Sequence, residues 1–94
     1  MITLIATIKA KQGQEKELAD LCVEMAKKVR ENEKGCLKYV PYVSLENPEE
    51  VVFIEKYKTA EDLDKHRKTA HYQEIVKNKI GALLAEAPEL EEFD

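Results

Sequence analysis

The segment from Val51 to Tyr57, VVFIEKY, constrains the fold of this 94-residue chain more than any other segment. Its four consecutive apolar residues, followed by Glu55-Lys56-Tyr57, predict a strand with apolar side chains on both of its faces. Such a strand needs a covering layer on each side. Helices of the same chain can supply one layer, but the second layer needs another source.

A short helix is expected directly after this strand. Residues 59–62, TAED, are typical of a helix start, because the Thr59 hydroxyl can accept from a first-turn amide and acids are favoured there. In this helix Leu63, His66 and Ala70 share one side. We therefore expect His66 to point under the sheet, toward the end of the preceding strand.

A second apolar stripe begins at Tyr72 and does not continue the first one in phase. The step from Leu63 to Tyr72 would turn an unbroken helix by roughly 180° at 3.6 residues per turn. We therefore predict a break near residues 69–71. His66 then belongs to a short helix, and His71 stands at the start of a longer one.

The first half of the chain alternates in the same way between strand and helix patterns. Residues 2–10 carry an apolar side chain at every second position, which predicts a strand. Residues 14–31 follow helical spacing, and the turn 32–35 ends that helix. Residues 36–43 predict a second strand, which lies at a sheet edge or carries a bulge because Pro41 has no amide hydrogen to donate.

Residues 89–93, which follow the helix-blocking Pro88, complete the order strand, helix, strand, strand, helix, strand. This order predicts an α+β fold of the ferredoxin-like βαββαβ type, with an antiparallel sheet and both helices on one face. We expect one domain over residues 1–94. To cover the other face of the sheet, we expect a homodimer with its sheets face to face, a dimeric α/β barrel.

Charge and cysteine usage exclude several classes of protein. The formal net charge is −4 and no cluster of lysine and arginine stands out, which argues against a nucleic-acid partner. No segment approaches the ~18 consecutive apolar residues of a membrane span. Cys22 and Cys36 form no CxxC pair, so we expect two reduced thiols that act as small core residues. These features predict a cytoplasmic protein without nucleic-acid or membrane partners.

Two residues are candidates for catalysis, His66 and Glu55. His66 can be a base near neutral pH, which takes a proton from a phenol or from a carbon next to a carbonyl. It can equally be a core histidine bonded to a backbone carbonyl. Glu55 can orient His66 or move a proton, with a pKa raised by burial. The alternative for Glu55 is a strand-end carboxylate that reaches water or pairs with Lys38.

Other side chains are candidates for binding a small-molecule substrate. They are bulky or amphipathic and suit the walls around a flat aromatic or keto ligand. The candidate substrate-binding residues are Tyr39, Phe53, Tyr57, His71 and Tyr72. A phosphorylated ligand would also need a cation, which Lys9, Lys38 or Arg67 could supply.

The two histidines do not form a metal-binding motif. His71 follows His66 by five positions, which places it about 140° round a regular helix. Zinc proteases carry their histidines at positions i and i+4, on one helix face. We therefore expect no metal site and no cofactor.

The chain resembles the antibiotic biosynthesis monooxygenase family over nearly its full length. The matching pieces are the first strand leading to Lys11-Gln12-Gly13, the segment 33–39 (EKGCLKY), Glu55-Lys56-Tyr57 before a helix, and His66 followed by residues 69–72 (TAHY). This resemblance implies small dimeric ferredoxin-like proteins that pair sheet to sheet. It also implies a ligand cavity between sheet and helices in each subunit.

The chemistry of this family divides into branches. Several members are linked to oxygenation of quinols or polycyclic phenols without flavin or metal, others degrade haem, and one branch isomerises a phosphorylated autoinducer-2 derivative. The haem-degrading branch depends on an asparagine, a tryptophan and a histidine. This chain has no tryptophan, and Tyr57 stands where many members carry one, so we set haem aside. Glu55, Tyr57, His66 and His71-Tyr72 are also similar to the isomerase branch.

These observations predict a cofactor-independent monooxygenase acting on a quinol-like or polyphenolic small molecule, with His66 assisting deprotonation. One alternative is an isomerase or tautomerase of a small carbonyl compound, in which His66 and Glu55 move protons. Another is a non-catalytic dimeric binding module. Oxygen uptake would distinguish the first from the other two.

Overall fold

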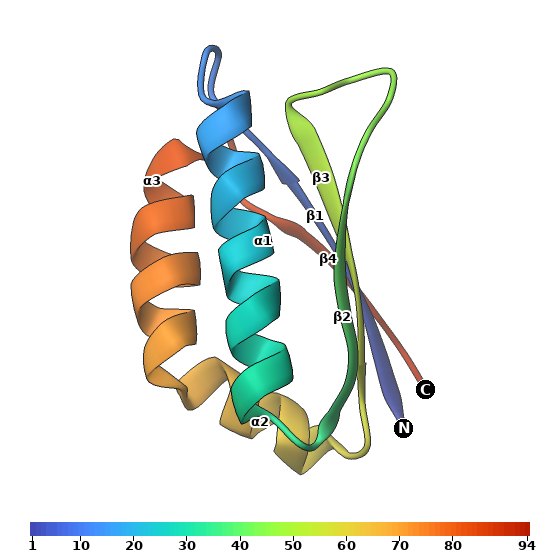
Figure 1. The fold of residues 1–94 in the computed structure, drawn as a ribbon. Helices are drawn as coiled ribbons and strands as arrows, with labels where there is room; N and C mark the ends of the chain where they lie inside the picture. Colours follow the sequence, from blue (N-terminus) through green and yellow to red (C-terminus); the bar gives the residue numbers. More distant parts are fainter.

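The computed structural model describes residues 1–94 and contains one sheet with helices on a single face (Figure 1). This confirms the predicted α+β, ferredoxin-like fold. None of the helices combines the length and the apolar character that a membrane span requires. In chain order the elements are β1 (Ile2–Lys9), α1 (Glu15–Asn32), β2 (Cys36–Val43), β3 (Glu50–Tyr57), α2 (Ala60–Lys68), the π-helix η1 (Tyr72–Ile80), α3 (Gly81–Leu83) and β4 (Glu89–Phe93).

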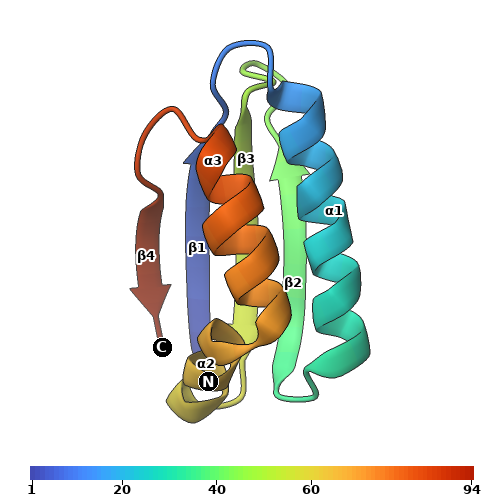
Figure 2. The ribbon, with the colours of Figure 1, turned by 90° about the vertical axis from the view of Figure 1, so that its left-hand side faces the viewer.

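The strands follow the order β2-β3-β1-β4, and every neighbouring pair is antiparallel. The two central strands, β1 and β3, are therefore brought together from distant parts of the sequence. Strand β2 lies at one edge, as the proline at position 41 predicts. Strand β4 forms the other edge, and Figure 2 shows it beside β1, outside the layer of helices.

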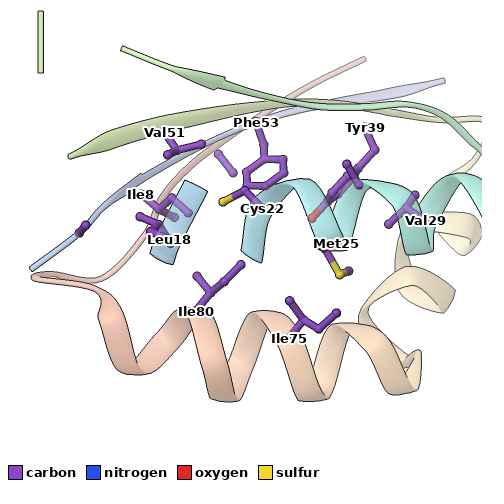
Figure 3. Packing of buried hydrophobic residues seen from close by; sticks show 13 residues of the cluster. Ile8, Leu18, Cys22, Met25, Val29, Tyr39, Val51, Phe53, Ile75 and Ile80 are labelled. Carbon is purple, nitrogen blue, oxygen red and sulfur yellow. The ribbon is translucent and has the colours of Figure 1, made fainter. Parts of the chain in front are cut away.

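The core lies between the sheet and the apolar sides of α1 and η1. Alternate residues of β1 and β3 point to this side, because side chains of a strand alternate between its two faces. Figure 3 shows Ile75 and Ile80 of η1 pointing toward the sheet, with α1 packed beside them. The buried cluster consists of Ala6, Ile8, Ala10, Leu18, Cys22, Met25, Ala26, Val29, Tyr39, Val51, Phe53, Ile75 and Ile80.

The helical segment after β3 is broken at Thr69, as the change of phase predicts. Thr69 has an extended backbone, with φ −67° and ψ 152°, and it ends α2. Its hydroxyl donates to the carbonyl oxygen of His66 at 2.8 Å and accepts from the amide of Tyr72 at 3.1 Å. One side chain thus caps the end of α2 and the start of the next helix.

The helix that follows the break differs from the α-helix that the apolar stripe predicts. Residues 72–80 form a π-helix, and the amide of Gly81 donates to the carbonyl of Val76, five positions back. The buried residues Ile75 and Ile80 are also five positions apart. Lys79, which lies next to Ile80, is exposed because the π-helix turns it away from the core.

Both cysteines are free thiols, as predicted. Burial raises the pKa of Cys22 and that of Cys36 to about 12, so each thiol stays protonated at neutral pH. Cys22 belongs to the buried cluster, and Cys36 packs against it. They therefore act as small core residues.

The face of the sheet that points away from the helices is also apolar. Val52 and Ile54 of β3 lie on this face, and they alternate along the strand with the residues that point toward the helices. Ile5 is the β1 neighbour of Ile54, and Tyr42 is the β2 neighbour of Val52. Tyr42 is 47% exposed. This apolar face is where the sequence predicts a second sheet.

Candidate active site

A cavity of about 480 Å³ lies between the helix-facing side of the sheet and the helices α2 and η1. Its size is that of a small-molecule site. Apolar and aromatic side chains form most of its wall, and the polar groups Glu55, His66 and Arg67 belong to it. The other lining residues are Leu4, Ala6, Ile8, Tyr39, Phe53, Tyr72, Val76, Lys77, Ile80, Gly81, Leu84, Glu86, Ala87, Pro88 and Leu90.

His66 occupies the end of the cavity next to α2 and is 2% exposed. Three tyrosine rings surround its imidazole. The ring centroids of Tyr39, Tyr57 and Tyr72 lie 5.2, 5.4 and 5.2 Å from that of His66. The structure thus brings together three tyrosines and a histidine that the sequence singles out, because α2 starts directly after β3 and crosses beneath the ends of β2 and β3.

The carboxylate bonded to His66 is Glu33, and not Glu55 as one hypothesis expected. Nδ1 of His66 lies 2.8 Å from Oε1 and 3.1 Å from Oε2 of Glu33. Nε2 of His71 lies 2.6 Å from Oε2 of the same carboxylate. The alternative in which His66 bonds only a backbone carbonyl does not hold either.

Glu33 is therefore ionised more readily than an isolated glutamate. Burial acts to raise the pKa of Glu33, but the hydrogen bonds and charge interactions with His66 and His71 outweigh it and lower the pKa. The carboxylate thus carries its negative charge next to both imidazoles.

Glu55 is buried in β3, with 4% of its surface exposed. The Tyr57 hydroxyl donates to its Oε1 at 2.6 Å. Burial raises the pKa of Glu55, although this hydrogen bond opposes the rise. Lys38 is the β2 neighbour of Lys56, which points to the opposite face of the sheet from Glu55. Glu55 therefore does not pair with Lys38.

Three polar atoms at this end of the cavity have no partner within the protein. Every fully buried side-chain nitrogen or oxygen atom has a hydrogen-bond partner. His66 Nε2, Glu55 Oε2 and the Tyr39 hydroxyl have no such partner, so none of these three atoms is fully buried. Because all three residues line the cavity, these atoms are available to a ligand there.

Two of the tyrosines near His66, Tyr39 and Tyr57, are hydrogen-bond donors rather than bases. Burial raises the pKa of Tyr39 and that of Tyr57 well above the ordinary value, and the nearby Glu55 raises both further. Their hydroxyls stay protonated at physiological pH. His66 and Glu55 are therefore the groups at this end that can accept a proton from a ligand.

Two residues expected to contact a ligand, Tyr57 and His71, do not line the cavity. Tyr57 is completely buried behind Glu55 and holds its carboxyl group. His71 lies on the other side of Glu33, to which it is bonded. Tyr39, Phe53 and Tyr72, in contrast, do line the cavity.

Of the three cations considered for an anionic ligand, only Arg67 lines the cavity. Its guanidinium lies 3.4 Å from Glu92 of β4, a long and mostly exposed ion pair. Lys77 of η1 lines the cavity as well. No group of three or more histidine, cysteine, aspartate or glutamate side chains is arranged to hold a metal ion.

The sequence model of the family described as antibiotic biosynthesis monooxygenase matches residues 1–78. The chain belongs to the antibiotic biosynthesis monooxygenase family. The match includes Glu33, Glu55 and His66, whereas the cavity wall from Ile80 to Leu90 lies beyond it.

Several solved structures are similar to this member of the family. A crystal structure of an antibiotic biosynthesis monooxygenase is 29% identical, with a TM-score of 0.92 over 100% of this chain and 97% of that chain. A candidate antibiotic biosynthesis monooxygenase from Caulobacter crescentus is 28% identical, with a TM-score of 0.91 over 99% and 87%. A Bacteroides thetaiotaomicron protein described as a possible oxidoreductase is 25% identical, with a TM-score of 0.88 over 98% and 94%. No curated protein matches the sequence.

Glu33 is the site residue that the sequence analysis does not identify as one, although Glu33 belongs both to the turn after the first helix and to the matching segment 33–39. One signal could have found it. Glu33 is the C-cap of α1, where the helix dipole favours cations and disfavours a carboxylate. A glutamate at that position needs compensating donors, and the two histidines supply them.

Proposed function

We propose that this protein is a cofactor-independent monooxygenase that acts on a quinol-like or polyphenolic small molecule. The observation that supports this is the group of free polar atoms on His66, Glu55 and Tyr39 at one end of an aromatic-walled cavity. A flat phenolic ligand can stack on the walls and direct a hydroxyl group at His66. Membership of a family of monooxygenases supports the same reaction class.

In the proposed first step, His66 Nε2 takes a phenolic proton from the substrate. The resulting anion is electron-rich and gives an electron pair to molecular oxygen, which forms a C–O bond. The peroxide anion becomes a hydroperoxide when His66 returns the phenolic proton to it. The hydrogen on that carbon then leaves as a proton, and the O–O bond breaks. A new carbonyl remains on the ring, and the departing hydroxide becomes water with the proton that was released from the carbon.

The electrons of this reaction all come from the substrate. One quinol and one O₂ give one hydroxylated quinone and one water, and the two hydrogens that the quinol loses enter that water. No external reductant is required. In this scheme the Tyr39 hydroxyl donates to the ligand oxygen, and the Glu55 carboxyl serves the second proton transfer.

Oxygen consumption with a panel of benzenediols, naphthalenediols and anthrones tests this proposal. We expect uptake of one O₂ per product. With ¹⁸O₂, one labelled atom should enter the product and the other should enter water. Uptake no faster than in buffer across the panel, or equal uptake by a His66→Gln variant, would contradict the proposal.

An isomerase or tautomerase is the second candidate, because the cations Arg67 and Lys77 line the same cavity as His66 and Glu55. A small phosphorylated carbonyl compound could pair with these cations while the two acid–base groups move its protons. Incorporation of deuterium from solvent under nitrogen would support this function. A ligand that raises the melting temperature without being converted would instead support a binding module.

A further inference from the structure

The three side chains His71, Glu33 and His66 form one buried cluster behind the cavity. Their side chains are 13%, 10% and 3% exposed. Only His66 lines the cavity, so Glu33 and His71 cannot contact a ligand there. The mechanism above gives neither of them a part.

We propose that Glu33, held in place by His71, is the positioning residue for His66: it keeps the proton of the neutral imidazole on Nδ1, so that the Nε2 lone pair faces the cavity. This inference rests on the proposed function only for the statement that His66 is the base. The arrangement itself can be measured without any substrate.

The chemistry of the carboxylate determines the direction of both hydrogen bonds. An ionised carboxylate can only accept, so Nδ1 of His66 and Nε2 of His71 must both donate to Glu33. In a neutral imidazole the nitrogen that does not donate is the acceptor. His66 Nε2, which has no protein partner, is then the free acceptor.

The carboxylate also stabilises the product of proton transfer. When His66 takes a proton at Nε2, the imidazolium lies 2.8 Å from a negative charge that is largely, though not completely, shielded from water. Donation by His71 to the second oxygen, at 2.6 Å, keeps Glu33 in one orientation. A histidine and a carboxylate paired in this way direct proton transfer in many enzymes.

Backbone hydrogen bonds and close packing against α2 fix the backbone around Glu33. The amide of Glu33 donates to the carbonyl of Val29 at 2.9 Å, and the amide of Lys58 donates to the carbonyl of Gly35 at 3.0 Å. A side chain at Gly35 would overlap the carboxylate of Asp62 in α2. The turn therefore packs directly on the helix that carries His66, which sets the short Glu33–His66 distance.

Nitrogen-15 NMR of the imidazoles tests the proposal directly, because the chain contains only two histidines. A His71→Gln variant identifies the signals of His66. In the unmodified protein we expect His66 to carry its proton on Nδ1 in the neutral form. A neutral His66 with its proton on Nε2 would overturn the proposal, whatever the activity.

The Glu33→Gln variant removes the charge but keeps the size of the side chain. We expect its His66 to lose the single tautomer, and kcat to fall ~10- to 100-fold with little change in KM, as for other partners of functional histidines. Glu31→Gln, an exposed change on α1, is the matched control and should behave like the unmodified protein. An unchanged tautomer and an unchanged kcat in Glu33→Gln would contradict the proposal.

Conservative variants separate positioning from simple stabilisation. Glu33→Asp keeps the charge but shortens the side chain. Compared with Glu33→Gln, it should therefore keep part of the Nδ1-protonated tautomer and part of kcat. If Glu33 were merely structural, these variants would lower the melting temperature and leave kcat and the tautomer unchanged. If no quinol is oxidised but His66 has the expected tautomer, the proposed function fails and the positioning of His66 stands.

Discussion

At the scale of single residues, His66 is fixed by groups that lie outside its own helix. Glu33 follows α1, Tyr39 lies in β2, Tyr57 in β3 and Tyr72 in η1, and all four contact the imidazole. The orientation of the ring therefore depends on the whole fold and not only on its own helix. A small shift in any of these segments should affect catalysis strongly, because proton transfer needs well-placed groups.

Replacement of His66 should abolish turnover while leaving the fold intact. Loss of a general base typically costs ~10² to 10⁴ in rate, so we expect a loss of this size in His66→Ala. His66→Gln should show the same loss with less effect on folding, since its amide can still donate to Glu33. Initial rates and the melting temperature are the measurements.

The other histidine provides the comparison for this prediction. His71→Ala should reduce the rate less than His66→Ala does, because His71 acts only through Glu33. Full activity in His66→Ala together with a lowered melting temperature would mean that His66 is a structural core histidine.

Glu55 and Glu33 should affect stability with opposite dependence on pH. Burial raises the pKa of Glu55, so its contribution to stability is present below the ordinary carboxyl pKa and is lost as pH rises through the raised value. The pKa of Glu33 is lowered, so its contribution is present above the ordinary value and is lost as pH falls through the lowered value.

We therefore expect Glu55→Gln to raise the melting temperature at pH 7 to 8, with a gain that shrinks toward pH ~4. Glu33→Gln should lower the melting temperature at neutral pH, with a loss that shrinks at low pH. Glu46→Gln in an exposed loop is the control. Parallel pH profiles for the two variants would contradict this assignment.

At the scale of the elements, a substitution at the first residue of α3, Gly81, tests the helical geometry of the segment after Thr69. Gly81 has helical angles, φ −52° and ψ −38°, and an added Cβ would lie 3.6 Å from the nearest atom, the carbonyl oxygen of Val76. Gly81→Ala should therefore stabilise the protein by ~0.4–1 kcal/mol, because it restricts the unfolded chain. In a domain of this size that raises the melting temperature by roughly 2–8 °C.

The neighbouring Ala82 supplies the reverse substitution. Ala82→Gly in the same exposed turn should destabilise the protein by ~0.5–1 kcal/mol. If Gly81→Ala lowered the melting temperature instead, the segment could not have the helical geometry described above.

Sequence periodicity predicted the elements because each one obeys its local pattern. Thr59 caps α2 as predicted, accepting from the Asp62 amide, and the loss of phase after Leu63 marked the break at Thr69. The π-helix was missed because an apolar stripe of 3.6-residue period also fits residues 72–84 approximately. Glu33 was missed because its partners lie 33 and 38 positions away, where no local pattern extends.

At the scale of the whole molecule, the apolar outer face of the sheet supports a homodimer. Ile5, Val52 and Ile54 lie in the two central strands on this face, and a second sheet packed on them would remove apolar surface from water. We expect sedimentation at micromolar concentration to give about twice the chain mass of 10.8 kDa. A stable monomer would contradict the sheet-on-sheet arrangement.

A charge on this face should separate the subunits. Ile54→Lys places an ammonium group where the second sheet would pack, so we expect a monomer in sedimentation. Val23→Lys changes an apolar residue that is 63% exposed on α1, and it should leave the dimer intact. Dimers in both variants would mean that the subunits associate through a different surface.

The two ends of the cavity are formed by different parts of the chain. Mutations can therefore change one end without changing the other. The end that contains His66 and Glu55 lies within residues 1–78, whereas Leu84, Glu86, Pro88 and Leu90 form part of the wall from the C-terminal segment. That segment ends in the edge strand β4, which lies outside the helical layer and pairs with β1 alone in the sheet (Figure 2). Exchange of this segment between relatives should therefore change which molecules fit while His66 and Glu55 stay in place.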